Sequence, residues 1–240
     1  MRTTKSLDKQ KIHNTKQSNM RTGTINNYVK FSKNFGGVRK CYEGKPTIAV
    51  GGFMCDKDLM PLNGAAMAAG TLIFADETAR TIVPIYTFKV LAVDTVAKTV
   101  KVEKYETGSI AKVGMKLLVV GDDLSQAVTN IATVTAIDSS NAGYDLLTMD
   151  EVVADSHAFI AEGDVLAEAK SDAVKKIKAI PNGLTYCDNV LDPDAYAIDI
   201  DYVWNCMEKP VLERRMPPLT SSLKKALRDN ECYFRFSNRK

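Results

Sequence analysis

The side chains with the strongest capacity for chemistry are few and lie far apart in the sequence. The two histidines are His13 and His157, and neither has cysteines at the spacing of a zinc site. No GxSxG motif or other nucleophile–base pair is recognisable. We therefore expect no catalytic residue, no metal site and no cofactor, and we expect the chain not to be an enzyme. His157 is expected at the surface.

Four aspartates close together in the sequence are the best candidate for cation binding. They are Asp192, Asp194, Asp199 and Asp201. A calcium loop also needs a central glycine and a terminal glutamate, and both are missing here. The solvated face of a strand is the alternative that we favour, because Tyr196–Val203 alternates apolar and acidic residues.

Cysteine usage and hydropathy restrict the environment of the chain. The five cysteines are odd in number and form no CxxC pair, which favours a reducing compartment over a disulfide framework. No apolar run approaches the roughly 20 residues that span a bilayer, so we expect no membrane partner. The basic N-terminus is not followed by an apolar core, so we do not expect a signal peptide.

Charge divides the chain into three parts. Residues 1–45 hold eleven Lys and Arg against two acids, whereas residues 46–206 hold twelve against twenty-three. Residues 207–240 hold nine against four. The expected organisation is an extended basic arm (1–45), a β-rich acidic body (46–206) and a C-terminal strand–helix–strand segment (207–240).

The basic arm has too few apolar residues, without pattern, to fold alone. We predict that it lies along a partner, since binding can offset the entropy of ordering it. Phosphate contact needs only positive charge, so nucleic acid remains open beside a protein partner. The candidate docking residues are its basic and aromatic side chains: Lys5, Lys9, Lys11, Lys16, Arg21, Tyr28, Lys30, Phe31, Lys33 and Phe35.

The body contains an internal repeat of about 44 residues, with units 70–113 and 114–157. Each unit opens with a glycine and an aliphatic run, at Gly70 and Gly114, and reaches an aspartate 24 residues later, at Asp94 and Asp138. A third opening of the same kind occurs at Gly163. The repeat predicts two similar β-units within a barrel or sandwich. Convergence on the same turn spacing is the alternative.

The expected elements of the body are mainly strands. They are Thr47–Val50, Thr71–Phe74, Thr87–Asp94, Thr99–Lys104, Tyr144–Met149 and Tyr196–Val203. Ser171–Ile180 carries a partial helical pattern that Pro181 ends.

The C-terminal segment is expected to contain the clearest helix. Thr220 precedes Ser221–Arg228 in the manner of an N-cap, with Leu223 and Leu227 turned inward. The strand before this helix should stop near Met216, because Pro217 and Pro218 cannot continue a hydrogen-bonded ladder. Cys232–Phe236 should form a closing strand.

These features together resemble the accessory head proteins of tailed bacteriophages: head-fibre, decoration or auxiliary capsid proteins of the crAss-like type. The resemblance is carried by three features: the glycine openings at Gly70, Gly114 and Gly163, the run Val211–Thr220 with the helix and strand after it, and the basic arm. It implies a structural role in the virion head after synthesis in the bacterial cytoplasm. It also implies β-barrel architecture, self-association as a homo-oligomer, and docking on the major capsid protein or other head proteins. A nucleic-acid-binding β-barrel that uses the basic arm is the alternative function.

Overall fold

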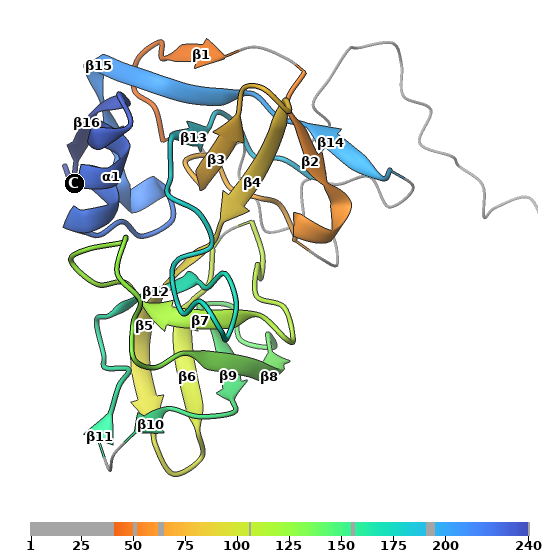
Figure 1. Ribbon diagram of the computed structural model, residues 1–240, viewed down its shortest axis with the longest axis vertical. Helices are drawn as coiled ribbons and strands as arrows, with labels where there is room; N and C mark the ends of the chain where they lie inside the picture. Colours follow the sequence, from red (N-terminus) through yellow and green to blue (C-terminus); the bar gives the residue numbers. More distant parts are fainter. Residues whose placement is uncertain are drawn as a thin grey trace, which may run out of the picture.

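The chain folds into a closed β-barrel beneath a curled eight-stranded sheet, with an α-helix near its C-terminal end (Figure 1). This computed structural model describes residues 41–49, 52–61, 65–105, 107–154, 157–190 and 195–239. The mainly β fold with a barrel and a short C-terminal helix, as predicted from the sequence, is confirmed.

The barrel consists of six antiparallel strands that close in the order β12-β5-β6-β9-β8-β7. Its strands are β5 (Thr87–Asp94), β6 (Thr99–Glu103), β7 (Lys116–Val119), β8 (Ala132–Asp138), β9 (Tyr144–Met149) and β12 (Val165–Glu168). Alternate side chains fill the interior, as a small barrel requires. Among these interior side chains, Val100, Leu117, Leu147 and Leu166 are fully buried.

The register of the barrel has an internal two-fold relation. Strands β5, β6 and β7 correspond to β8, β9 and β12. Lys89 on β5 pairs with Val165 on β12, and the equivalent pair in the other half is Thr133 on β8 with Lys116 on β7. The axis passes through the pairs Val100–Leu147 and Leu118–Ala167, since each pair maps onto itself. Both hairpins carry a β-bulge at the same place, between Val90 and Ala92 and between Val134 and Ala136.

Each of the three glycine openings forms the same tight turn. Gly70, Gly114 and Gly163 have φ values of 81°, 86° and 90°, which favour glycine at the third position of a type II turn. The turns are closed by bonds such as Met115 N to Lys112 O (3.1 Å) and Asp164 N to Ala161 O (3.2 Å). The repeated glycine in the sequence therefore marks a repeated backbone shape.

The repeat differs from the predicted units in its opening strand. The hairpins keep the 44-residue spacing, since Val90 corresponds to Val134. Strand β3 (Leu72–Asp76), which follows Gly70, pairs instead within the eight-stranded sheet. Strand β12, which follows Gly163, takes the place in the second half of the barrel that β7 takes in the first half. The order along the chain is therefore the β5–β6 hairpin, β7, the β8–β9 hairpin and β12.

The eight-stranded sheet runs in the order β1-β15-β13-β3-β4-β2-β14, and β16 pairs with β15. Besides β3, its strands are β1 (Thr47–Ala49), β2 (Met54–Asp56), β4 (Thr81–Ile85), β13 (Gly183–Thr185), β14 (Ala197–Asp199), β15 (Tyr202–Leu212) and β16 (Tyr233–Ser237). A separate ribbon pairs β10 (Val153–Ala154) with β11 (His157–Ala158), and the 3-10 turns are η1 (Lys57–Leu59) and η2 (Glu213–Arg215).

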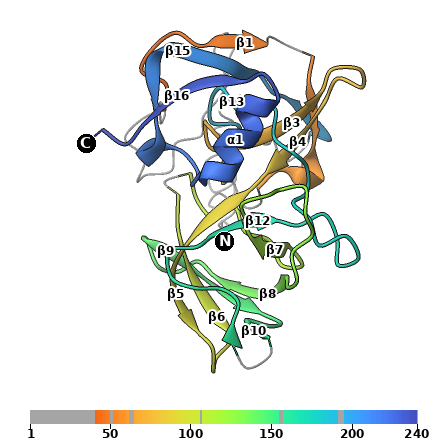
Figure 2. The same ribbon diagram turned by 60° about the vertical axis from the view of Figure 1, so that its left-hand side comes forward.

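Helix α1 (Ser221–Asp229) covers one face of this sheet, beside β16 (Figure 2). Thr220 caps it by accepting a hydrogen bond from the Leu223 N–H at 3.3 Å. Leu223 and Leu227 pack among Leu72, Leu184 and other buried side chains. The predicted helix, its cap and its inward face are confirmed.

Three predicted elements are different in the structure. Tyr196–Val203 is not one strand, because β14 ends at Asp199 and the buried Ile200 begins the passage to β15. The strand before Pro217 ends at Leu212, and η2 fills the interval to Met216. Ser171–Ile180 contains no helix and instead bridges back through Ile177 to Ala169. A short amphipathic pattern was therefore overridden by tertiary pairing.

Candidate functional site

The ten docking residues that the sequence predicts all precede Cys41 and lie outside the described residues. The structure does describe the point where the arm joins the body. Leu212 N donates to Cys41 O at 2.8 Å, and Glu43 N donates to Pro210 O at 3.2 Å. Cys41 is fully buried, and the Tyr42 hydroxyl donates to Thr185 O at 2.7 Å. Residues 41–43, which sequence reasoning assigned to the arm, are thus bonded to β15 and β13.

Close packing holds this junction against β15. A Cβ on Gly44 would lie 2.8 Å from the Cβ of Lys209, so only glycine lets the chain run this close. The Tyr42 ring stacks on Tyr186 with centroids 6.1 Å apart. Burial is the largest of several causes that raise the pKa of the Tyr42 hydroxyl well above its ordinary value. The arm therefore leaves the body from a fixed point.

An open basic hollow of about 580 Å³ lies beside this point. Its cations are Lys209, Arg235 and Arg239, and its acids are Glu43 and Glu208. The Arg239 guanidinium binds both carboxylate oxygens of Glu43, at 2.5 and 2.7 Å. This pair ties the C-terminal strand to the junction, because Glu43 follows the bonded Cys41–Tyr42 segment.

Two apolar side chains on the strands that line the hollow are exposed. Met207 on β15 and Tyr233 on β16 are 55% and 49% exposed. Tyr233 pairs with Asn205 across the parallel strands. The sequence indicated the positive charge and the strand–helix–strand order of the C-terminal segment, but not that this segment meets residues 41–45. They meet because β16 pairs with β15 in parallel, and that long-range pairing has no local signal.

Each barrel hairpin has one aspartate at its turn, Asp94 in the β5–β6 turn and Asp138 in the β8–β9 turn. The two turns lie at opposite ends of the β6–β9 pair, and the β5–β6 turn is the one far from β15 (Figure 1). Asp94 accepts from the N–H groups of Val96 and Ala97, and Asp138 from that of Ser140. That backbone hydrogen bond is the main cause of the lowered pKa of Asp138. The Asp138 carboxylate therefore stays ionised to a lower pH than an ordinary aspartate.

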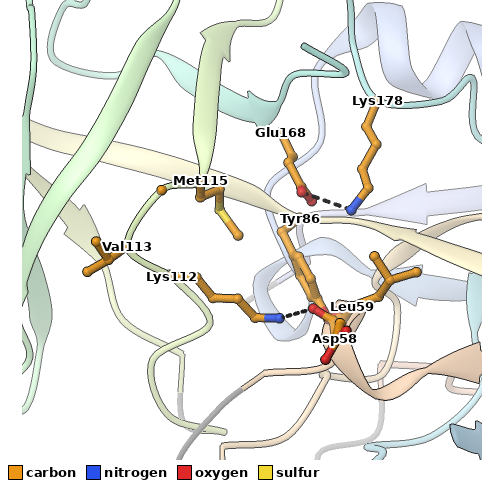
Figure 3. Close-up of a pocket in the computed structure, with 9 residues that line it drawn as sticks. Asp58, Leu59, Tyr86, Lys112, Val113, Met115, Glu168 and Lys178 are labelled. Atoms are coloured by element: carbon orange, nitrogen blue, oxygen red, sulfur yellow. Dashed lines mark hydrogen bonds and ion pairs between the residues drawn. The ribbon is translucent and has the colours of Figure 1, made fainter.

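A second candidate is a pocket of about 210 Å³ between the sheet and the barrel (Figure 3). Lys112 and Lys178 enter it from two loops, and Glu168 enters from the end of β12. The Lys112 ammonium donates to Asp58 O at 2.6 Å, and the Lys178 ammonium pairs with Glu168 Oε1 at 2.8 Å. The Tyr86 hydroxyl donates to Leu59 O at 2.7 Å. The Lys112 and Tyr86 bonds thus tie η1 to the barrel side of the pocket, and the Lys178–Glu168 pair ties β12 to the loop after it.

The pKa shifts of the ionisable side chains around this pocket also indicate a structural role. Desolvation lowers the pKa of Lys112, and Glu168 raises it by a smaller amount. Burial raises the pKa of the neighbouring Cys55 thiol to about 12, so the thiol is protonated and weakly nucleophilic. One oxygen of Glu168 is buried without a hydrogen-bond partner. We assign the pocket to packing between barrel and sheet.

The acidic cluster is only partly described. Asp192 and Asp194 lie outside the described residues. Asp199 lies exposed on β14 and accepts a hydrogen bond from Phe53 N at 3.0 Å. Within the described ranges, no three His, Cys, Asp or Glu side chains are grouped to hold a metal ion. The five cysteines, all within the described residues, form no disulfide, and His157 is exposed.

Comparisons with known proteins give no relative. No family model matches the chain, and no curated protein or solved structure is detectably similar to it. None of the described helices is both long and apolar enough to cross a membrane.

Proposed function

We propose that this chain is a structural protein of a tailed-bacteriophage head. In this proposal it docks on the capsid shell through its N-terminal arm and self-associates through its β-body. The major capsid protein is the proposed partner. The virion role rests on the sequence resemblance, and the docking role rests on the surface around the root of the arm.

One observation supports this docking surface most strongly. The arm begins at a segment bonded to β15, next to Lys209, Arg235 and Arg239. A partner that engages the basic arm therefore also meets the basic C-terminal strand.

The mixed charge of the hollow favours a protein partner over a polyanion. Glu43 and Glu208 lie among the cations, and each would repel a phosphate backbone. Exposed Met207 and Tyr233 add apolar area, which protein interfaces use at their centre. A patterned acidic and apolar protein surface matches this arrangement.

Binding to purified phage heads tests the proposal. The full chain is expected to co-sediment with heads that lack it, and a chain without residues 1–40 is expected to stay in the supernatant. Deletion must stop before Cys41, because Cys41 and Tyr42 belong to the packed body. Circular dichroism checks that the shortened chain is folded. Equal sedimentation of a folded shortened chain would refute docking through the arm.

Nucleic-acid binding remains the second candidate, and exposed Tyr233 close to Arg235 is the observation in its favour. Aromatic rings beside cations provide stacking and phosphate contacts for single strands. This function predicts affinity for single-stranded DNA or RNA that falls by orders of magnitude between low and physiological salt. Absence of binding at low salt would eliminate it.

A further inference from the structure

One ion pair closes part of the basic hollow beside the root of the arm. The Arg239 guanidinium uses a single nitrogen, Nη2, to bind both carboxylate oxygens of Glu43, at 2.5 and 2.7 Å. The two-nitrogen fork that arginine can offer to a carboxylate is therefore not used. Apart from this pair, the guanidinium bonds to no other described residue. The pair lies at the surface, since the Arg239 side chain is 65% exposed.

The two partners of this pair are held differently. Glu43 belongs to the segment that is bonded to β15, because its N–H donates to Pro210 O at 3.2 Å. Arg239 lies two residues beyond the end of β16, and its backbone N–H donates to the Ser237 hydroxyl at 3.2 Å. Opening of the pair therefore needs only a rotation of the long Arg239 side chain, while the strands and their bonds stay in place.

Two further cations of the hollow have no acidic partner. Lys209 and Arg235 line the hollow, and their side chains form no ion pair or hydrogen bond with the described residues. The stem of Lys209 is held over Gly44, where an added Cβ would lie 2.8 Å from the Lys209 Cβ, so this cation stays beside the Glu43 segment. A carboxylate that enters the hollow therefore meets three cations, of which Arg239 alone is already paired.

We propose that Arg239 binds a carboxylate of the docking partner, and that Glu43 holds the place of this carboxylate in the undocked chain. An aspartate or glutamate side chain of the partner displaces Glu43 and bonds to the guanidinium fork, close to Lys209 and Arg235. The inference rests on the proposed function, because it names the chemical group that the docking surface recognises and the residue that recognises it.

The exchange of one carboxylate for another changes the free energy little, because an exposed ion pair contributes little net stability. The incoming carboxylate also gains the attraction of Lys209 and Arg235, which have no acidic partner in the described residues. A neutral surface that displaced Glu43 would leave Arg239 without an acceptor. Glu43 therefore lowers the affinity of docking and raises its selectivity for acidic partners.

Removal of the Glu43 charge tests this exchange on phage heads. Glu43→Gln should raise the affinity of the full chain for heads that lack it about two- to fivefold, because a neutral amide competes poorly with a carboxylate for Arg239. Glu208→Gln is the matched control, since it removes the same charge from the same hollow but from a residue that is not bonded to Arg239. Its gain should be smaller. Equal gains, or no gain from Glu43→Gln, would overturn the proposal.

A double-mutant cycle shows whether the gain depends on Arg239. Arg239→Gln alone should weaken head binding, and Arg228→Gln, on the exposed side of α1, should not. In chains that already carry Arg239→Gln, the gain from Glu43→Gln should fall to that of Glu208→Gln. A full gain in the absence of Arg239 would show general charge repulsion and contradict the exchange. Thermal unfolding checks that each variant is folded.

A peptide probe tests the same site without phage heads. Acetyl-tetraglutamate amide is titrated into the full chain, and the NMR signal of the Arg239 Nε–H group is followed. This signal should shift in the unchanged chain, and Glu43→Gln should lower the midpoint concentration about two- to fivefold. Absence of a shift would overturn the proposal. A larger gain for single-stranded oligothymidine than for the peptide would overturn it too.

The two assays separate this proposal from the function on which it rests. If the peptide gives the expected result and phage heads are never bound, the proposed function fails and the carboxylate site at Arg239 stands. If the unchanged chain, Glu43→Gln and Arg239→Gln bind heads with equal affinity, the proposed function stands and the exchange fails.

Discussion

Replacing the three turn glycines by alanine separates backbone strain from steric contact. The three φ values lie between 81° and 90°, so alanine meets the same left-handed penalty, about 1–2 kcal/mol, at each site. A Cβ on Gly114 or Gly163 would meet nothing within 4 Å. A Cβ on Gly70 would lie 2.7 Å from Met216 Cβ and 3.2 Å from Cys41 Sγ. Overpacking adds about 1–3 kcal/mol at Gly70 alone.

The assay is thermal or urea unfolding of the three variants beside the unchanged chain. Gly114→Ala and Gly163→Ala should lose similar amounts, roughly 2–8 °C in Tm for a chain of this size. Gly70→Ala should lose clearly more, because Met216 and Cys41 are packed in the core beneath the arm junction. Neutral effects at Gly114 and Gly163 would refute the shared turn, and an equal effect at all three would refute the close contact at Gly70.

Three further predictions concern the helix and two titrating groups. Leu223→Asp should destabilise the fold by more than about 3 kcal/mol in urea unfolding, because it places a carboxylate where the leucine side chain is fully buried. Unchanged stability would contradict the packing of α1. Burial raises the pKa of Cys187 to about 11, so at pH 8–9 its alkylation should be slower in the folded than in the urea-unfolded chain, and equal rates would contradict the burial. Because the pKa of Asp138 is lowered, its hydrogen bond from Ser140 N should persist as the pH falls through the ordinary aspartate range and weaken only below that range. An NMR titration that gives an ordinary or raised pKa for Asp138 would contradict this.

Local patterns predicted much of the fold. The hairpin strands Thr87–Asp94 and Tyr144–Met149 agree with the structure to the residue, because alternation and bounding turns mark a half-buried strand clearly. Thr220 predicted the start of α1, because its hydroxyl accepts from a local N–H. Gly114 and Gly163 located two turns correctly, because the shape of each turn depends on the residues within it.

Long-range pairing was not predictable in the same way. The sequence around Gly70 and Gly114 is alike, yet β3 joins the sheet and β7 joins the barrel. This choice depends on the partners β13 and β12, which are more than 40 residues away in sequence. The apolar pair Cys41–Tyr42 was the only signal that the body begins within the arm. Nothing local to Arg235 or Lys209 indicated that they lie beside this pair.

Cross-linking of intact virions, followed by mass spectrometry, tests the proposed function most directly. A lysine-reactive reagent should join Lys30, Lys33 and the other lysines before Cys41 to the major capsid protein. Lys209, beside the root of the arm, should do the same. Lys98 and Lys101, on the β5–β6 hairpin far from β15, should not. Absence of this chain from purified virions, or links to the capsid protein from Lys98 and Lys101 alone, would contradict the docking function.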